Sequence, residues 1–356
     1  MTAVEWLESL SPWPQDGFGL DRMRALLAEL GDPQLAFVSV HVVGTNGKST
    51  TTRTIEETLL REGVSAAAYT SPHVTGWGER IRIGGAEVDV ERALARIRPV
   101  AVELGATQFE TLTAAALAEF AEAGVEAAAV EAGLGGRHDA TNVLRSPVQV
   151  LTNVALEHTE VLGSTREAIA VEKLAVVQPG STVVIGEPEW EPLARENGAA
   201  QIVVETGGNQ ALAGAAASAF LGRTVEPAEV QLPGRLERRG DEIWDGAHTP
   251  DAVRHIAPSL PPIGSVVASI LSDKDVDGVL AELARTASIL VATRSSNQRA
   301  LAAGRLAECA RPHFAHVEAV ESPREALARA HELGEPVLVT GSLYLLADLW
   351  PSTVHA

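Results

Sequence analysis

A glycine-rich stretch, VVGTNGKST at residues 42–50, carries the first residues whose types and spacing could do chemistry. It follows an apolar run typical of a buried strand and precedes a helical run, so its backbone N–H groups could cradle an anion. Lys48 could reach the β- and γ-phosphates of a nucleotide, and Ser49 or Thr50 could meet a magnesium ion. The spacing is not that of a strict P-loop, because the first glycine is Gly44 and not residue 42. The pattern favours phosphate binding over a plain strand–turn–helix.

Lysine is rare in this chain, which has only Lys48, Lys173 and Lys274 against 25 arginines. An ammonium is a compact point charge and a guanidinium a planar fork, so each lysine suggests a role that arginine cannot fill. The scarcity strengthens the assignment of Lys48 to phosphate. For Lys173, in a predicted helix, the count leaves two interpretations equal: chemistry specific to an amine, or an ordinary ion pair with a carboxylate such as Glu172 or Glu167.

Three polar side chains could form a metal site. They lie in loops that we expect near the glycine-rich stretch, because the carboxyl ends of parallel strands meet at one edge of a sheet. Ser71 in YTSPH, Glu110 in QFET and His158 in NVALEHTE offer a hydroxyl, a carboxylate and an imidazole. Oxygen ligands suit Mg²⁺, whereas imidazole is a less usual ligand for a hard cation. Each residue alone is more often structural, so the set is a hypothesis about magnesium beside a nucleotide.

Two further motifs stand close together in the last third of the chain. DGAHTP begins at Asp245, and LPGR ends at Arg235. Asp245 could hold a ribose hydroxyl, and Arg235 could contact a phosphate. Either residue alone could equally be a turn residue or part of a surface ion pair, so the two motifs support a nucleotide site only together.

Strands that alternate with helices must position these residues. Strands are expected at FVSVHVV, AAAVEAGLGG, VQVLTNVALEH and TVVIGEP, with helices around 50–62, 90–104, 111–123 and 165–177. A second alternation has strands at EIWD, SVVASIL, ASILVATR, HFAHVEAV and PVLVTG. The pattern predicts an α/β fold with parallel sheets and ligands at the carboxyl ends of the strands. We expect two domains, 1–222 and 235–356, joined by a linker at 223–234.

The composition limits the partners and the compartment. The net charge of −19 argues against binding a nucleic-acid backbone or an anionic membrane, but is compatible with a small anionic substrate at a locally basic site. A lone Cys309 excludes an internal disulfide and a cysteine zinc cluster, and fits a reducing compartment. The first ten residues lack the pattern of a signal peptide, and no apolar run approaches the roughly 18 residues that span a bilayer. We therefore expect a soluble, cytoplasmic protein and a monomer.

In their order along nearly the whole chain, the motifs resemble the folylpolyglutamate synthase/dihydrofolate synthase family, relatives of the Mur ligases. The resemblance is carried by HVVGTNGKST, YTSPHVTGWGERIRI, EAGLGGRHDATNV, LTNVALEHTEVLGSTREAIAVEKLAVVQPG, LPGRLE, DGAHTPDA, LSDKD and TGSLYLLADL. It implies an N-terminal P-loop-type Mur-ligase ATPase domain and a smaller Rossmann-like C-terminal domain. The implied activity is an ATP-dependent, ADP-forming ligase that joins L-glutamate to a folate-type carboxylate through an acyl phosphate.

The resemblance also assigns roles to individual residues. Ser71, Glu110 and His158 match the family's magnesium ligands, and Lys173 matches a lysine that is carbamylated and supports a second magnesium ion. A carbamate turns the ammonium cation into an anion with two oxygen donors, which arginine cannot readily do. Lys48, His158 and Lys173 are the expected catalytic residues. The expected ATP contacts are Gly44, Thr45, Asn46, Gly47, Lys48, Ser49 and Thr50, followed by Arg235, Asp245 and His248.

Several positions depart from the family pattern. Ser49 replaces a glycine of the phosphate loop, Glu157 replaces an aspartate and Thr249 replaces an asparagine. An adenine contact is put in question by Asn209, Gln210 and Ala213, and the 186–232 segment is shorter than usual. Two alternatives therefore stay open: a Mur-like ligase for another carboxylate and amine, and a nucleotide-binding paralogue without turnover. The sequence does not decide between dihydropteroate and folate as the acceptor.

Overall fold

The computed structural model describes residues 1–14 and 17–351, which fold into two compact units. The first unit comprises residues 1–71 and 77–230, and the second comprises residues 72–76 together with the chain from 231 onward. The main division falls within the stretch 223–234 that the sequence suggests as a linker. A short segment from the first third of the sequence therefore belongs to the second unit.

The first unit is built on an eight-stranded sheet of order β4-β3-β2-β5-β1-β6-β7-β8. The six strands from β2 to β8 are parallel, and β3 and β4 form an antiparallel extension at one edge. β1 lies between β5 and β6, so loops that follow these three strands meet at one edge of the sheet. The strands are β1 (Val38–Val43), β2 (Ala66–Tyr69), β3 (Ile81–Ile83), β4 (Ala86–Glu87), β5 (Ala127–Glu131), β6 (Val148–Leu151), β7 (Thr182–Ile185) and β8 (Gln201–Val204).

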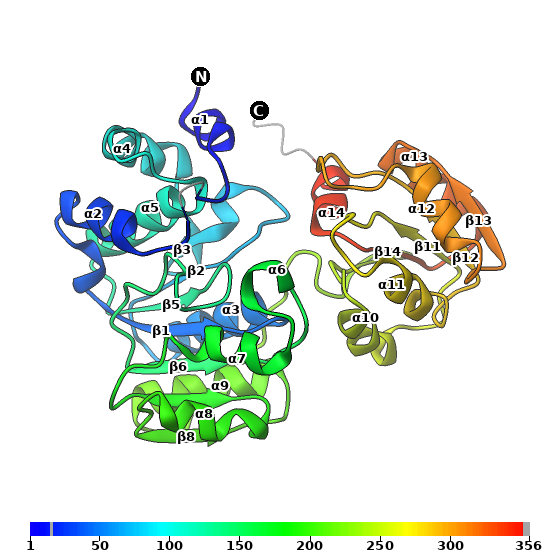
Figure 1. Cartoon of the computed structure of the whole chain (residues 1–356). Helices are drawn as coiled ribbons and strands as arrows, with labels where there is room; N and C mark the ends of the chain where they lie inside the picture. The colour runs from blue at the N-terminus through cyan, green and yellow to red at the C-terminus, as the bar shows by residue number, and fades with distance from the viewer. Residues whose placement is uncertain (15–16, 352–356) are drawn as a thin grey trace. The chain divides into compact units, whose positions relative to one another are not determined.

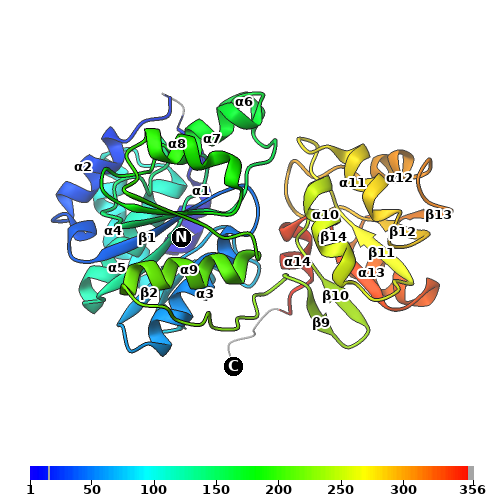
Figure 2. The same ribbon diagram turned by 90° about the horizontal axis from the view of Figure 1, so that it is seen from below.

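Helices cover both faces of this sheet (Figure 1). The alternation of β1 sends Val40 and Val42 to one face, where α3 and α9 lie side by side, and Val43 to the other, where α7 and α8 pack (Figure 2). A separate apolar cluster joins α1, α2, α4 and α5 to β2. The helices are α1 (Ala3–Ser9), α2 (Asp21–Glu29), α3 (Lys48–Arg61), α4 (Val90–Glu103), α5 (Gln108–Ala123), α6 (Thr159–Leu162), α7 (Arg166–Leu174), α8 (Glu191–Glu196) and α9 (Asn209–Leu221), with 3₁₀ turns at Pro33–Leu35, Trp77–Arg80 and Pro188–Trp190.

The second unit has a six-stranded sheet of order β13-β12-β11-β14-β10-β9, parallel except for β9. α10, α11 and α12 pack on one face, and α13 and α14 pack on the other. The strands are β9 (Glu237–Arg239), β10 (Glu242–Trp244), β11 (Ser265–Ala268), β12 (Ile289–Ala292), β13 (His316–Ala319) and β14 (Val337–Thr340). The helices are α10 (Pro250–Ile256), α11 (Val276–Leu283), α12 (Ala303–Ala310), α13 (Pro323–Leu333) and α14 (Leu343–Leu349), with a 3₁₀ turn at Ala257–Ser259.

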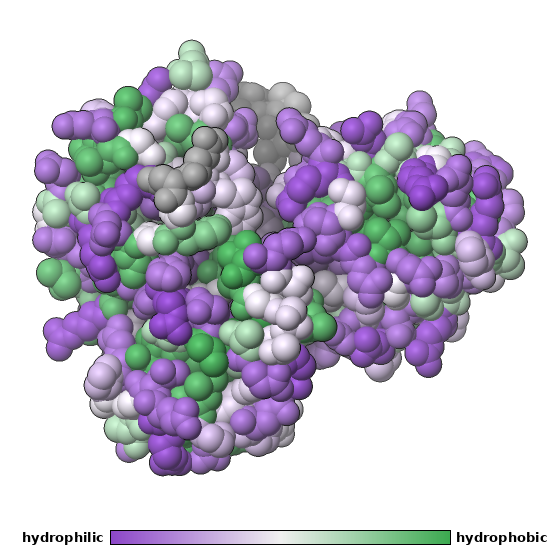
Figure 3. Space-filling view, viewed as in Figure 1, coloured by the Kyte–Doolittle hydropathy of each residue, from purple (hydrophilic) through white to green (hydrophobic). Residues whose placement is uncertain are grey.

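The prediction of an α/β protein with two largely parallel sheets is confirmed. On the face seen in Figure 3, hydrophilic side chains are interleaved with scattered apolar ones. Across residues 1–14 and 17–351, no helix is both long enough and apolar enough to cross a membrane.

Candidate active site

The glycine-rich loop between β1 and α3 is a cradle that only glycine can form at two positions. Gly44 has φ 148° and Gly47 has φ 81°, both in the region that side-chain-bearing residues rarely adopt. A Cβ on Gly44 would lie 1.9 Å from Thr152 Oγ1, and one on Gly47 would lie 2.2 Å from Asn209 Oδ1. α3 begins directly afterwards at Lys48. The loop amides and the helix N-terminus therefore fit a phosphate group, as the sequence predicts.

Two residues after β6 hold this loop in place. Asn153 accepts hydrogen bonds from the backbone N–H of Thr45 (to its carbonyl, 2.9 Å) and of Asn46 (to Oδ1, 3.0 Å). Thr152 Oγ1 donates to the carbonyl of Asn46 at 2.7 Å. Lys48 Nζ donates to the carbonyl of Thr45 at 3.2 Å, so the lysine lies along its own loop. Neither Thr152 nor Asn153 is among the predicted site residues, although both stand at the carboxyl end of a predicted strand.

Lys173 lies against the same loop. It sits in α7 with only 1% of its side chain exposed, and Nζ donates to the carbonyl of Gly44 at 2.8 Å and to Glu157 Oε1 at 2.7 Å. Lys173 therefore does form an ion pair with a carboxylate, but the partner is Glu157 and not Glu172 or Glu167, the two examples that the sequence suggests. Glu172 pairs instead with Arg137 Nε at 2.9 Å.

Burial and the charge of the partner shift the pKa values of Lys173 and Glu157 in opposite directions. Burial lowers the pKa of Lys173; the attraction of Glu157 raises it only in part, and the nearby Lys48 lowers it further. Burial would raise the pKa of Glu157, but the positive charges of Lys173 and Lys48 outweigh it and lower that pKa to about 2. Glu157 is therefore anionic at neutral pH, and the Lys173 amine gives up its proton more easily than a solvated lysine.

A buried carboxylate that sequence reasoning missed lies beside Ser71. Glu131, the last residue of β5, is 1% exposed, and its Oε2 accepts a hydrogen bond from the backbone N–H of Ser71 at 3.1 Å. β5 pairs with β2, which runs into the Ser71 loop, and with β1, which runs into the phosphate loop. The position of Glu131 at the carboxyl end of an apolar run is the signal that could have identified it.

Glu110 has a different environment. Its Oε2 accepts hydrogen bonds from the backbone N–H and the hydroxyl of Thr107, each at 2.8 Å, which forms a capping box at the start of α5. The same oxygen pairs with Arg22 Nε at 2.8 Å. The structure thus brings Glu131 to Ser71, whereas Glu110 caps the start of α5 and pairs with Arg22, which speaks against Glu110 as a free metal ligand.

His158 immediately precedes α6, next to Glu157. Its backbone is left-handed, with φ 45° and ψ 43°, an uncommon and costly conformation for a residue with a side chain. Its ring centroid is 6.4 Å from that of Trp13. Within the two described ranges, no group of three His, Cys, Asp or Glu side chains is arranged to hold a metal by itself.

The predicted nucleotide residues of the second unit do lie together, at the carboxyl end of β10. Asp245 is 5% exposed and accepts hydrogen bonds from the backbone N–H of Leu236 (2.9 Å) and of Ala247 (2.8 Å). Burial raises the pKa of Asp245, although Arg235 opposes the shift. His248 Nδ1 is 2.9 Å from the carbonyl of Gly246, and a Cβ on Gly246 would be 2.8 Å from Arg235 Nη1. The sequence motifs LPGR and DGAHTP therefore form one cluster.

Comparison with known proteins defines the class. The profile of the Mur ligase middle domain matches residues 42–215, and that of the Mur ligase glutamate ligase domain matches residues 234–343. The fold and the phosphate loop are thus those of a Mur ligase. The chain is 30% identical to the dihydrofolate synthase/folylpolyglutamate synthase of Escherichia coli strain K12, over 97% of this chain and 93% of the relative. It belongs to the folylpolyglutamate synthase/dihydrofolate synthase family, and the resemblance found in the motifs is confirmed.

Solved structures agree with this assignment. The folylpolyglutamate synthase of Mycobacterium tuberculosis, complexed with ADP and AMPPCP, matches with a TM-score of 0.86 at 29% identity, over 97% of this chain and 96% of that one. A bifunctional folylpolyglutamate synthase/dihydrofolate synthase with Mn, AMPPNP and L-glutamate bound matches with a TM-score of 0.84 at 30% identity, over 98% and 97% of the two chains.

Proposed function

We propose that this chain is an ATP-dependent, ADP-forming ligase that adds L-glutamate to a folate-type carboxylate. The observation that carries the proposal is the position of Lys173, whose Nζ bridges the carbonyl of Gly44 in the phosphate loop and the carboxylate of Glu157. A buried amine and carboxylate at a phosphate cradle suit the transfer of a phosphoryl group to a carboxylate better than they suit simple binding. Relatives support the substrates: the Escherichia coli enzyme has been solved with DHPP and ADP, and a bifunctional folylpolyglutamate synthase/dihydrofolate synthase has been solved with L-glutamate.

The reaction follows from the weakness of a carboxylate as an electrophile. Transfer of the γ-phosphoryl group of ATP to the acceptor carboxylate gives an acyl phosphate and ADP, and attack by the glutamate amine then forms the amide and releases phosphate. The protein contributes positioning and charge stabilisation. The amides of residues 44–50 and Lys48 would hold the phosphates, and Arg235, Asp245 and His248 would contact the nucleotide.

We extend the proposal to a divalent metal, with magnesium as the expected ion. Ser71, Glu131 and His158 would hold it, with Glu131 in place of the predicted Glu110, because Glu131 is the carboxylate beside Ser71. A hydroxyl, a carboxylate and an imidazole are acceptable donors, and the ion would neutralise charge on the phosphate oxygens. The donor chemistry therefore fits a metal.

We also propose that Lys173 is carbamylated and serves a second magnesium ion. Carbon dioxide adds only to a neutral amine, and burial lowers the pKa of Lys173 in that direction. Lys173→Ala should lower the turnover number by on the order of a hundred-fold, and short carboxylic acids with excess bicarbonate should restore part of it. Lys173→Arg preserves a positive charge but forms no such carbamate, so full activity in this variant would contradict the proposal.

The activity itself is tested by phosphate release from MgATP with L-glutamate and either dihydropteroate or tetrahydrofolate. We expect release that depends on both glutamate and acceptor, with a product heavier by one glutamyl unit in mass spectrometry. Lys48→Ala serves as the inactive control. ATP binding without turnover on either acceptor would overturn the folate assignment, and would favour a ligase for another carboxylate or a binding protein without turnover.

A further inference from the structure

The loop that follows β6 carries several groups of the candidate site, and two charged side chains hold it at Val154. Residues 152–153 of this loop hydrogen-bond to the phosphate loop, and residues 157–158 come shortly afterwards. Val154 lies between these two pairs of residues and is 2% exposed. Its backbone N–H donates to Glu187 Oε2 at 2.9 Å, and its carbonyl accepts from Arg166 Nε at 2.8 Å. Both backbone polar groups of one buried residue are therefore satisfied by charged side chains.

Arg166 and Glu187, which we call the Val154 bracket, are also fixed to each other. Arg166 Nη2 donates to Glu187 Oε1 at 2.9 Å, and Trp190 Nε1 donates to Glu187 Oε2 at 2.8 Å. The guanidinium carbon of Arg166 lies 5.3 Å from the centroid of a Trp190 ring. A guanidinium can donate to a carbonyl and to a carboxylate at once, because its donors form a rigid fork. The side chains of the pair are 41% and 31% exposed, and an ion pair so exposed adds little stability, so its contribution is mainly geometric.

The bracket connects the loop after β6 to two other elements of the first unit. Arg166 is the first residue of α7 and precedes Lys173 by seven residues, which is nearly two turns, so both side chains leave the same side of the helix. Lys173 bonds to Glu157 near the end of the loop, and α7 therefore holds the loop at two points. Glu187 follows β7, the strand that pairs with β6. Groups from α7 and from the chain after β7 thus fix a loop that itself hydrogen-bonds to the phosphate loop.

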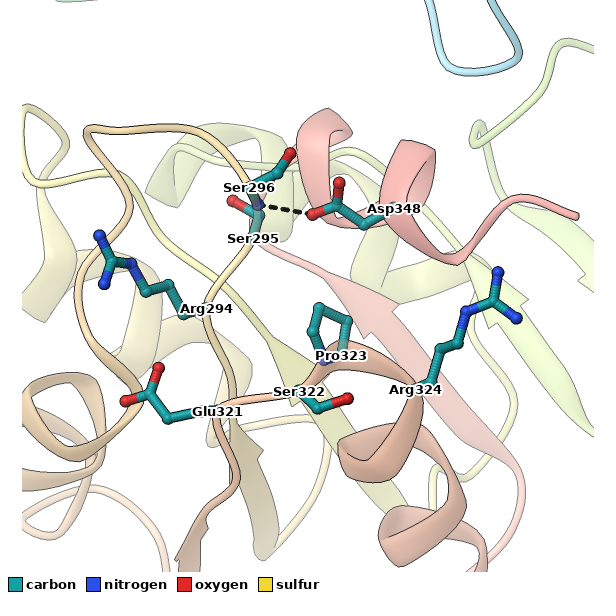
Figure 4. A pocket seen from close by; sticks show the side chains of 8 residues that line it. All are labelled: Arg294, Ser295, Ser296, Glu321, Ser322, Pro323, Arg324 and Asp348. Carbon is teal, nitrogen blue, oxygen red and sulfur yellow. Dashed lines mark hydrogen bonds between the residues drawn. The ribbon is translucent and has the colours of Figure 1, made fainter. Parts of the chain in front are cut away.

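The bracket differs from an ordinary carboxylate that fixes a loop, of which the second unit has an example. Asp348 Oδ2 there accepts a hydrogen bond from the backbone N–H of Ser296 at 2.7 Å (Figure 4). Arg294 and Arg324 line the same hollow, but their side chains point away from one another (Figure 4). Asp348 thus holds one amide, whereas at Val154 a paired arginine and glutamate hold the N–H and the carbonyl of a single residue. The peptide planes on both sides of Val154 are therefore fixed.

We propose that Arg166 and Glu187 are positioning residues for phosphoryl transfer, and the inference rests on the proposed ligase function. By fixing the peptide groups of Val154, they keep Asn153 against the phosphate loop. In the same way they keep Glu157 beside the buried amine of α7. A displacement of about 1 Å in such groups can lower a rate on the order of a hundred-fold, so the bracket acts on nucleotide affinity and on turnover through the loop.

The test compares the full-length protein with Arg166→Ala, Glu187→Ala and the double variant. Each single variant should bind MgADP about ten-fold more weakly in calorimetry and lower kcat by about the same factor, and the double variant should lose no more than the worse single one. Glu187→Gln keeps an acceptor for the N–H of Val154 and should retain more affinity than Glu187→Ala. Amide exchange without ligand should quicken at Val154. Glu189→Ala is the matched control, because Glu189 pairs with the same Arg166 Nη2 at 2.7 Å but leaves both bonds to Val154 in place.

The outcomes separate positioning from stability and from the proposed function. A lower melting temperature with unchanged MgADP affinity and kcat, both measured well below the melting range, would make the bracket merely structural and overturn the inference. Losses that multiply in the double variant would also overturn it, since the two residues would then act separately. An equal loss in Glu189→Ala would assign the effect to surface charge instead. A wild type that binds MgADP but turns over no folate acceptor, with affinity lost in the variants, would count against the function and support the bracket.

Discussion

The most informative residue is Lys173, because its environment explains why an amine stands there. A buried ion pair is weak support for stability, since removing two charges from water costs much of what their attraction returns. The Lys173–Glu157 pair lies beside the carbonyl of Gly44, so its charges act on the phosphate loop. Rarity of lysine pointed to this residue, whereas its partner could be found only in the structure.

The pair predicts a specific dependence of stability on pH. The pKa of Glu157 is lowered from 4.5 to about 2 in the folded protein. A carboxyl group with a lowered folded pKa contributes stability that is fully present above its unfolded pKa and is lost as the pH falls towards its folded pKa. In protein kept free of carbon dioxide, where Lys173 is an ammonium, the free energy of unfolding of the wild type should therefore exceed that of Glu157→Gln by an amount that shrinks by about 3 kcal/mol between pH 5 and pH 2.

Urea unfolding at a series of pH values measures this difference. Glu172→Gln is the matched control, because Glu172 pairs with Arg137 nearer the surface. Its side chain is 28% exposed, against 13% for that of Glu157. A constant gap between wild type and Glu157→Gln over the acid range would contradict the assigned charge of Glu157.

At the scale of elements, the sequence predicts those with a strong pattern. The apolar run of β1, the helix α3 and the strands β5, β6 and β7 are where periodicity places them, because burial on both faces makes parallel strands continuous apolar runs. β2 is missed because three of its four residues are alanines, which have little strand propensity; the strand forms because it is buried between β5 and the antiparallel β3. The short edge strands β4, β8 and β9 are also missed, because their sequences show no pattern typical of a strand.

Some residues of the site can be predicted from local motifs, whereas others can be placed only when the order of the strands in the sheet is known. The glycine loop is recognisable from its spacing, and the Arg235–Asp245–His248 cluster from two neighbouring motifs. Glu131 needs the knowledge that β5 lies between β2 and β1, which no local pattern supplies. Glu110 carries a local signal of another kind, since Thr107 and Glu110 form the T-x-x-E signature of a capping box.

At the scale of the whole molecule, one short segment belongs to a different unit from the residues that flank it in the sequence. Residues 72–76, which follow directly on Ser71, belong to the second unit. Val74 is 3% exposed and packs in the apolar cluster that contains Trp244, Leu343 and Leu346. A Cβ on Gly234 would lie 3.4 Å from Val74 Cγ2, which shows how closely the segment lies against the LPGR turn. The Ser71 loop is therefore tied covalently to a segment that the second unit's core holds.

This arrangement predicts that a substitution early in the sequence weakens the C-terminal unit. Val74→Ala should lower the stability of that unit by about 2 kcal/mol, because it deletes buried methyl groups and leaves a cavity. Hydrogen exchange should quicken for amides of β14 and α14 and stay unchanged for those of β1 and β5. Val102→Ala on α4, where the valine is 59% exposed, is the matched control. Faster exchange in β1 and β5, with none in β14, would assign the segment to the first unit instead.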